Sequence, residues 1–266
     1  MSKLLIFALI FPFQSIAQIN EQWIKEDSLF IKQVINKLDK TPENIHKILK
    51  PDNSFFQDLG YGYSNATGSN GKGYVSFFYN LIFKNKKLIS FSLKSQLPNE
   101  KQIRDRYIKI YGSNFKFDSS RYSKTYYWNY GLACKPIISD SLYTHQNDST
   151  LCFLMSPYSG INYGDYAGWG SRLKNRIIFE SIQDQLNCDS INNLLLSINP
   201  ATRLYAAEYY LTYSDKFKDP IVRKIIDDRI ESMLNNTPNV KVNYADMIIN
   251  ENAKYILDVY VKKNKK

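Results

Sequence analysis

The sequence predicts an α+β fold, with an N-terminal antiparallel sheet and packed helices followed by a small C-terminal α-helical bundle. Two observations support this. Residues 73–98 have the pattern of a β-hairpin, with helical periodicity before and after it. From Ser171 onward the apolar residues recur at helical spacing. A hairpin, a helix and further strands in that order are typical of a helix packed on an antiparallel sheet.

The hairpin prediction rests on its two arms. The second arm alternates between apolar and polar side chains from Ile89 to Lys94, and the first arm has apolar residues at the same period of two, at Phe77, Tyr79, Leu81 and Phe83. A register that pairs Phe83 with Ile89 brings the two apolar sets together. It leaves residues 85–87 as a three-residue loop. A two-residue turn is the competing arrangement, but it faces apolar residues with polar ones.

The other N-terminal elements follow from spacing and turn residues. Residues 57–73 are rich in Gly, Ser, Asn and Tyr, so we expect a loop there. The remaining expectations are helices over residues 20–39 and from Thr41, a helix from Pro98 ended by Gly112, and strands over residues 125–130, 132–138 and 151–156.

These elements suggest a division of the chain into four segments. The segments are a signal peptide at 1–17, an α+β sheet domain at 18–160, a Gly/aromatic linker loop at 161–170 and a helical domain at 171–266. In the last segment we expect helices over residues 173–186 and 191–198, two helices that begin with the caps Asn199-Pro200 and Asp219-Pro220, and a final helix over residues 245–261.

The N-terminus has the layout of a secretory signal peptide. Lys3 supplies the positive region, residues 4–13 form an apolar run, and Ser15 and Ala17 are the small residues of a cleavage site. Cleavage after Ala17 predicts an exported protein, periplasmic or secreted, and no later stretch is apolar enough for a transmembrane segment. The alternative is a buried N-terminal helix.

Export favours one disulfide among the cysteines Cys134, Cys152 and Cys188. We expect Cys134 to pair with Cys152, because the two lie in segments predicted as neighbouring strands. Three buried free thiols are the alternative. No Cys-x-x-Cys occurs and His46 and His145 are the two histidines, so we expect no metal and no cofactor.

The net charge of +10 raises the question of an acidic partner. Most of the basic residues are Lys, and Asn, Ile and Tyr are abundant too. All four have A/T-rich codons, so a biased genome explains the composition. Arg, which suits bidentate phosphate recognition, is scarce. We therefore expect no nucleic-acid partner.

The best candidate binding surface is the Gly-rich loop with the rings of Tyr158, Tyr163, Tyr166 and Trp169 and the carboxylate of Asp165. Tyr and Trp give large contact areas at low entropic cost, which suits a stacking platform for a sugar or a peptide. The alternative is that these rings fill the seam between the two domains.

Catalytic residues are harder to find in this sequence. Asp165 and Glu180 are the least implausible pair of carboxylates for glycoside hydrolysis. The competing interpretation gives Asp165 a turn-forming role and leaves Glu180 in water. Asp-Ser pairs resemble acceptor motifs for bacterial O-glycosylation, above all at Ser141 and Ser149.

We therefore expect a non-catalytic binding or interaction module of the bacterial cell envelope or secreted space. Its partner would be a protein or a glycan of the envelope. The alternative is a hydrolase that acts on envelope or extracellular polymers.

Overall fold

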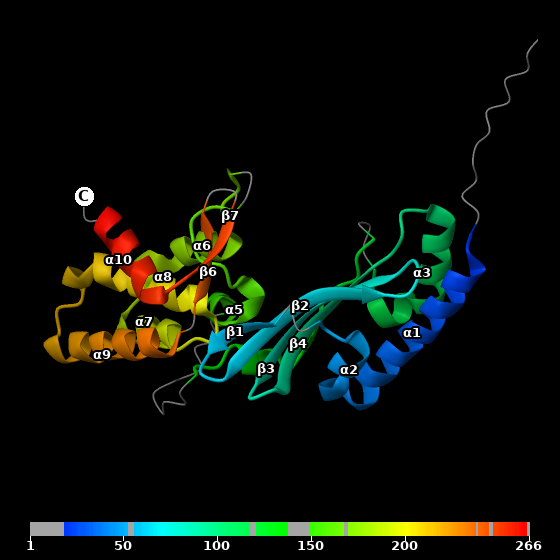
Figure 1. The fold of residues 1–266 in the computed structure, drawn as a ribbon, viewed down its shortest axis with the longest axis horizontal. Coiled ribbons are helices and arrows are strands. Elements are labelled where there is room, and N and C mark those ends of the chain that lie inside the picture. The colour runs from blue at the N-terminus through cyan, green and yellow to red at the C-terminus, as the bar shows by residue number, and fades with distance from the viewer. Residues whose placement is uncertain are drawn as a thin grey trace, which may run out of the picture.

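The computed structural model describes residues 19–52, 56–117, 121–137, 149–167, 170–237, 239–244 and 247–264. It confirms the α+β class, with a five-stranded antiparallel sheet in the N-terminal part and mostly helices after it. Figure 1 shows an elongated molecule with the sheet towards one end and the helical part at the other. The predicted signal peptide lies outside the described residues.

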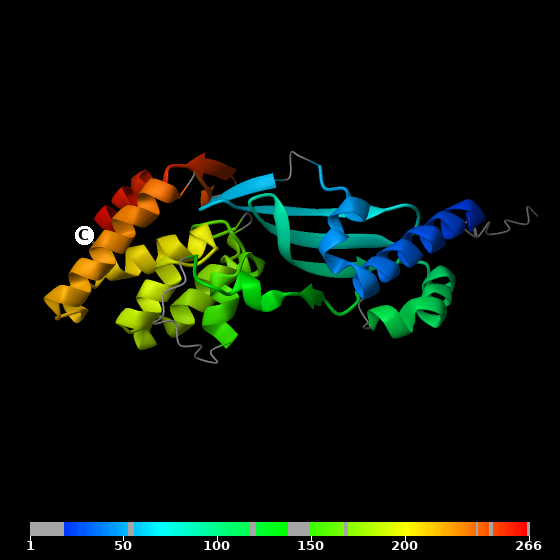
Figure 2. The ribbon, with the colours of Figure 1, turned by 90° about the horizontal axis from the view of Figure 1, so that it is seen from below.

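The sheet is a meander in which each strand pairs with the next one along the chain. Its strands are β1 (Phe56–Gly60), β2 (Tyr63–Gly71), β3 (Ser76–Lys84), β4 (Lys87–Gln96) and β5 (Tyr126–Trp128). One face is covered by α1 (Glu21–Lys40), η1 (Pro42–Asn44), α2 (His46–Leu49) and α3 (Lys101–Phe115). Figure 2 shows α1 and α2 in front of that face.

Burial follows the alternation of the hairpin arms. Phe77, Leu81 and Phe91 are fully buried against the helices, whereas Phe78, on the opposite face, is 40% exposed. Alternate side chains of a strand point to opposite faces, so a single row of apolar residues per strand is enough to build this core.

Asp27 ties α1 to the sheet and to α3. Its carboxylate is fully buried, and Oδ2 accepts hydrogen bonds from the amides of Tyr74 and Val75 and from the hydroxyl of Tyr107 at 2.7 to 3.1 Å. Burial raises the pKa of Asp27, and the hydrogen bonds from Tyr107 and the backbone oppose that shift only in part.

The hairpin register agrees with the prediction along most of its length but not at the tip. Leu81 faces Phe91 as predicted, whereas Phe83 faces Leu88 rather than Ile89. A bulge inserts one extra residue into β4 at this point. It turns Ile89 away from the helix-covered face, and Ile89 packs against the core that joins the sheet to the helical part.

The predicted three-residue loop of the hairpin is therefore wrong. The turn has two residues, Asn85 and Lys86, with φ values of 48° and 66°. Positive φ at both central residues is what a type I′ turn requires, and that turn matches the twist of the flanking strands.

The expected loop at 57–73 is also wrong, because β1 and β2 occupy most of it. β2 pairs with β3 over its whole length, from Tyr63 opposite Lys84 to Gly71 opposite Ser76. Pairing with β3 specifies this strand, so its own Ser, Asn and Gly residues need no apolar alternation.

Three further expectations in this region are wrong. Leu132 lies in the short α4 (Tyr130–Ala133) and Leu151 in α5 (Ser149–Met155), where strands were predicted. Short apolar runs do not distinguish a strand from a buried helical turn. Gly112 lies inside α3, which continues to Phe115.

The helical part is built around α8, whose residues from Pro200 to Tyr210 are all buried. Around it lie α6 (Lys174–Ile182), η5 (Gln183–Gln185), α7 (Cys188–Leu195), α9 (Pro220–Asn236) and α10 (Ala253–Asn264). Asn199 and Asp219 cap α8 and α9 as predicted, each accepting a hydrogen bond from a first-turn amide.

The predicted last helix at 245–261 is wrong at its start. A two-stranded hairpin of β6 (Val240–Tyr244) and β7 (Met247–Glu251) precedes α10. Val240 and Val242 of β6 are buried against the helices. β7 pairs with β6 along its whole length, so it is a strand where a helix was expected.

The two parts meet in a small core of Leu59, Tyr63, Ile82, Ala133 and Ile198. Beside this core the fully buried Arg203 of α8 donates a hydrogen bond from Nη2 to the Leu59 carbonyl. Among the described helices, none combines the length and the apolar character needed to cross a membrane.

Candidate functional site

A cleft of about 420 Å³ lies where the open face of the sheet meets the helical part. Figure 1 shows β6 and α6 beside the end of the sheet, and both elements contribute residues to the cleft. Its lining residues come from the sheet, a loop and α6 with β6: Gln57, Asn65, Thr67, Asn80, Pro157, Tyr158, Ser159, Gly160, Ile161, Asn162, Leu173, Lys174, Asn175 and Lys241.

The sheet wall of the cleft presents three carboxamides. Asn65 donates hydrogen bonds from Nδ2 to the side-chain oxygen of Asn80 and, at 3.2 Å, to the carbonyl of Leu81. Both polar atoms of the Gln57 carboxamide are buried and have no hydrogen-bond partner among the described residues. Because an unpaired buried amide costs free energy, Gln57 is the residue of this wall that would gain most from a bound partner.

The opposite wall is a loop fixed by buried amides. Asn175 donates from Nδ2 to the carbonyls of Gly160 and Asn162 at 3.0 and 2.9 Å, and Asn199 donates to the Gly160 carbonyl at 2.8 Å. The Asn162 side chain reaches across to Asn243 of β6 at 2.8 Å. These bonds preorganise the loop wall, which reduces the entropy that binding would cost.

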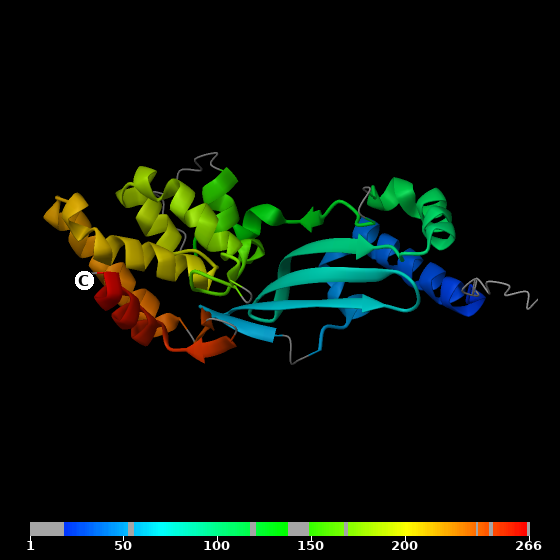
Figure 3. The ribbon, with the colours of Figure 1, turned by 90° about the horizontal axis from the view of Figure 1, so that it is seen from above.

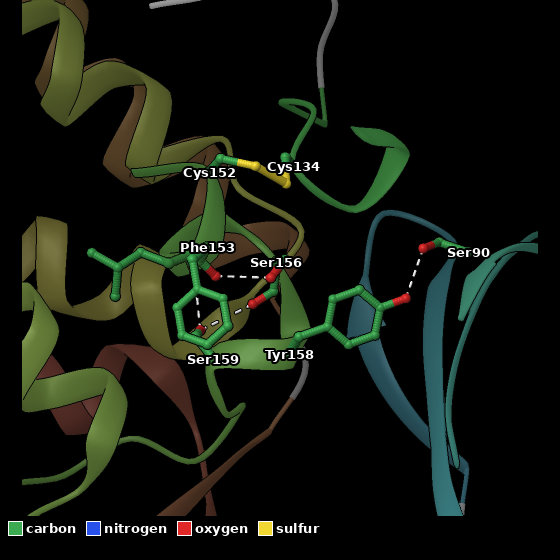
Figure 4. The surroundings of a disulfide bond; sticks show 8 residues. Ser90, Cys134, Cys152, Phe153, Ser156, Tyr158 and Ser159 are labelled. Carbon is green, nitrogen blue, oxygen red and sulfur yellow. Dashed lines mark hydrogen bonds between the residues drawn. A yellow bond between two sulfur atoms is a disulfide. The ribbon is translucent and has the colours of Figure 1, made fainter. Parts of the chain in front are cut away.

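Tyr158 connects the loop wall to the sheet wall (Figure 4). Its hydroxyl lies 2.7 Å from Ser90 Oγ, and its ring stacks on Tyr130 with 5.8 Å between ring centres. Burial raises the pKa of the Tyr158 hydroxyl, so the hydroxyl stays protonated at neutral pH. Ser90 donates its own proton to the Trp128 carbonyl, and Tyr158 is therefore the donor to Ser90.

A disulfide anchors the helix that precedes this loop. Cys134 and Cys152 are joined in the structure, as Figure 4 shows, and their Cα atoms lie 4.8 Å apart. The predicted pair is therefore confirmed, but the prediction that it joins two neighbouring strands is wrong. Cys134 follows the short helix α4, and Cys152 lies in the short helix α5. Cys188 is free, and burial raises the pKa of its thiol.

The structure separates the residues of the predicted aromatic platform. Tyr158 lines the cleft, whereas Tyr163 is fully buried in the helical core and is wrong as a stacking surface. Tyr166 is 50% exposed but does not line the cleft, and Trp169 lies outside the described residues. The expected surface of four rings is therefore reduced to Tyr158 in the cleft and an isolated Tyr166.

The glycines of this loop allow it to pack against β6. Gly164 has a φ of 132°, and a Cβ there would lie 2.8 Å from the Asn243 carbonyl. On either side of Val242 the backbone exchanges hydrogen bonds with Tyr163: the Tyr163 amide donates to the Lys241 carbonyl at 2.8 Å, and the Asn243 amide donates to the Tyr163 carbonyl at 2.9 Å. The segment thus lies alongside the β6–β7 hairpin, and its Gly content reflects close approach of two backbones.

Asp165 and Glu180, the predicted pair of carboxylates, converge on one guanidinium. Arg176 Nε lies 3.2 Å from Asp165 and 2.9 Å from Glu180, and Arg176 Nη1 lies 2.7 Å from Glu208. The Glu208 carboxylate also accepts a hydrogen bond from the Tyr163 hydroxyl at 2.7 Å. We call these five residues the Arg176 network.

The protonation of this network does not suit acid–base catalysis. Burial alone would raise the pKa of Glu180, but hydrogen bonds from Arg172 and Arg176 outweigh it and leave that pKa lowered. A general acid needs a pKa near the working pH. The network therefore anchors the Gly-rich loop to α6 and α8.

A second cavity of about 490 Å³ lies beside the Arg176 network. It is lined by Glu180 and Glu208, which both form ion pairs with Arg176, and by the rings of Tyr205, Tyr209 and Tyr213 among others. Lys216 places its ammonium 4.6 Å from the Tyr213 ring centre. Both carboxylates that line this cavity thus have a partner in the protein, whereas the Gln57 carboxamide of the cleft has no hydrogen-bond partner among the described residues.

The described residues contain no group of three or more His, Cys, Asp or Glu side chains arranged to hold a metal ion. Scans against models of known protein families, curated proteins and solved structures found no match to this chain. The function is therefore inferred from the chemistry of the cleft itself.

Most of the cleft residues were missed by the sequence analysis. Asn and Gln follow no periodic pattern and occur throughout this Asn-rich chain, so nothing distinguished Gln57, Asn65, Asn80, Asn162 and Asn175. Only the fold brings them together, from the free face of the sheet, the facing loop and α6.

Proposed function

We propose that this protein is a non-catalytic binding module of the bacterial cell envelope or secreted space, and that it binds a glycan in the cleft between the sheet and the helical part. The N-terminal layout of residues 1–17 supports the exported location. The Gln57 carboxamide is the observation that most supports a ligand at the cleft.

Carboxamides suit a glycan because each one offers both a donor and an acceptor. A sugar hydroxyl likewise donates and accepts. Gln57 and Asn80 lie on one wall of the cleft and Asn162 on the other, and the half-buried Tyr158 also lines it. Clefts at domain junctions with convergent polar groups are common ligand sites.

A hydrolase is not supported by any arrangement of the described residues. Asp165 and Glu180 are held by Arg176, and the residues that line the cleft include no carboxylate. A glycosidase of the usual kind needs two carboxyl groups that face the scissile bond.

The test is a glycan-binding screen followed by calorimetry on the variant Gln57→Leu. Leu has a similar volume but no hydrogen-bonding group, so we expect affinity to fall at least about tenfold, the effect of one lost hydrogen bond to a buried partner. Stability should not fall, because the Gln57 amide has no protein partner to lose among the described residues.

The matched control is Gln102→Leu at an exposed position of α3, which should leave binding unchanged. Failure of the wild-type protein to bind any glycan would contradict the proposed function. So would a Gln57→Leu variant that binds as the wild type does.

A further inference from the structure

The cleft has an uncompensated positive charge. Two of its lining residues are lysines, Lys174 at the start of α6 and Lys241 in β6, and none is acidic. Lys174 places its ammonium 4.9 Å from the Phe153 ring centre. The ion pairs of the described residues all involve other cations. A concave site with cations and no acid attracts anions.

The polar wall of the cleft continues onto the open face of the sheet. One row of facing residues crosses four strands: Thr67, Asn80, Ser92 and Tyr127. Thr67 and Asn80 line the cleft, and Tyr127 is 43% exposed beyond it. Figure 3 views the molecule from this side, with the strands of the sheet in front of α1.

The next row along the strands carries an aromatic surface and a third cation. Phe78 faces Lys94 across β3 and β4 and is 40% exposed. Lys94 places its ammonium 4.5 Å from the ring centre of Tyr122, and this ring lies 6.5 Å from that of Phe78. Two residues along a strand span about 7 Å, so this row lies about 7 Å beyond Asn80.

We propose that the ligand is an acidic glycan, a chain of sugars that carry carboxylates, and that it extends from the cleft over the open sheet face to Phe78 and Lys94. This inference rests on the proposed function and assigns it a ligand class. The carboxamides bind hydroxyls, Lys241 and Lys94 bind carboxylates at the two ends, and Phe78 contacts the apolar face of a sugar ring.

Charge complementarity favours this ligand over a neutral one. A neutral glycan leaves the half-buried Lys241 in the cleft without an anion, whereas a uronate supplies one. An extended ligand is favoured because the polar row through Ser92 connects the cleft to Lys94 without an intervening acidic residue.

The experiment is calorimetry with uronate oligosaccharides of two and six units and with neutral oligosaccharides of the same lengths. We expect the six-unit uronate to bind at least about tenfold more tightly than the neutral chains, one close charge contact being worth about tenfold. It should bind a few-fold more tightly than the two-unit uronate, which does not reach Lys94. Its affinity should fall as salt is raised.

Variants locate the two ends of the ligand. Lys241→Gln should weaken both uronates about tenfold, whereas Lys94→Gln should weaken the six-unit uronate alone by a few-fold, as expected for a contact on the open sheet face rather than in the cleft. Lys109→Gln, at an exposed position of α3, is the matched loss of charge and should change nothing.

Four outcomes would contradict the inference. Equal affinity for neutral and acidic chains would rule out an acidic ligand. A six-unit affinity that Lys94→Gln leaves unchanged would rule out an extended ligand. Either result leaves glycan binding intact. Equally tight binding of a single-stranded oligonucleotide shows unselective attraction of polyanions. Binding of no oligosaccharide at all contradicts the proposed function itself.

Discussion

The hydroxyl of Tyr158 donates a hydrogen bond to Ser90 Oγ, 2.7 Å away, and this bond joins the two walls of the cleft. The residues lie 68 positions apart in the sequence, one in the Gly-rich loop and the other in β4. The width of the cleft thus depends on a contact between the sheet and the helical part.

Removal of this hydrogen bond should cost little stability. In Tyr158→Phe the ring keeps its contacts with Tyr127 and Tyr130, so we expect the free energy of unfolding to fall by about 1 kcal/mol. Urea denaturation of the variant checks this value. A loss of several kcal/mol would mean that the hydroxyl supports more than this one bond.

The Arg176 network should matter far more for stability. The Glu208 side chain is only 6% exposed, so Arg176→Gln removes the guanidinium from a nearly buried carboxylate and should cost about 3–5 kcal/mol. The matched control is Arg172→Gln, whose exposed ion pair with Glu180 should contribute less than about 1 kcal/mol.

Chemical denaturation of both variants tests this contrast. The double variant Arg176→Gln, Glu208→Gln should recover part of the loss, because it removes the stranded charge. Equal effects of Arg176→Gln and Arg172→Gln would contradict the structural role that we assign to the network.

Asp27 predicts a pH dependence of stability. Its folded-state pKa is raised above the unfolded value of 3.8, so the folded state binds more protons between these two pKa values. The contribution of Asp27 to the free energy of unfolding is therefore fully present below pH 3.8 and is lost as the pH rises through the folded pKa.

The variant Asp27→Asn lacks this titration while its side-chain oxygen can still accept hydrogen bonds from Tyr74, Val75 and Tyr107. The difference in unfolding free energy, wild type minus Asp27→Asn, should decrease as the pH rises above 3.8. A difference that increases with pH would mean that the carboxylate is stabilised in its charged form.

The disulfide should contribute to stability through the unfolded chain. Cys134 and Cys152 are separated by 18 residues, and closing a loop of that size is worth about 3 kcal/mol. The double variant Cys134→Ser, Cys152→Ser should lose about that much, whereas Cys188→Ser, at the free cysteine, should lose less than about 1 kcal/mol. Denaturation midpoints compare the three proteins.

The hairpin shows how far the sequence alone can specify a structure. The facing pair Leu81 and Phe91 was predictable because an alternating apolar arm can bury only one of its faces. The bulge was not, since Ile89 is apolar and suits either the helix-covered face or the junction core. Which face it takes depends on Ile82 and on helical residues far along the chain.

The candidate site was less predictable for a related reason. The sequence analysis selected aromatic and charged residues as binding candidates, yet two of them, Tyr163 and Asp165, hold the loop in place through the Arg176 network. Carboxamides such as Gln57 and Asn80 carry no sequence signal, because their role follows from the strand register that places them beside the loop. A register of this kind is a long-range property.

The most direct test of the account is the response of individual carboxamides to a ligand. We would follow the side-chain NH₂ signals of Gln57 and Asn80 by NMR during titration with the six-unit uronate, with Gln102 on α3 as the internal reference. The account predicts that the Gln57 and Asn80 signals shift together and saturate while Gln102 stays fixed. Saturable binding that leaves both cleft signals unmoved would contradict it.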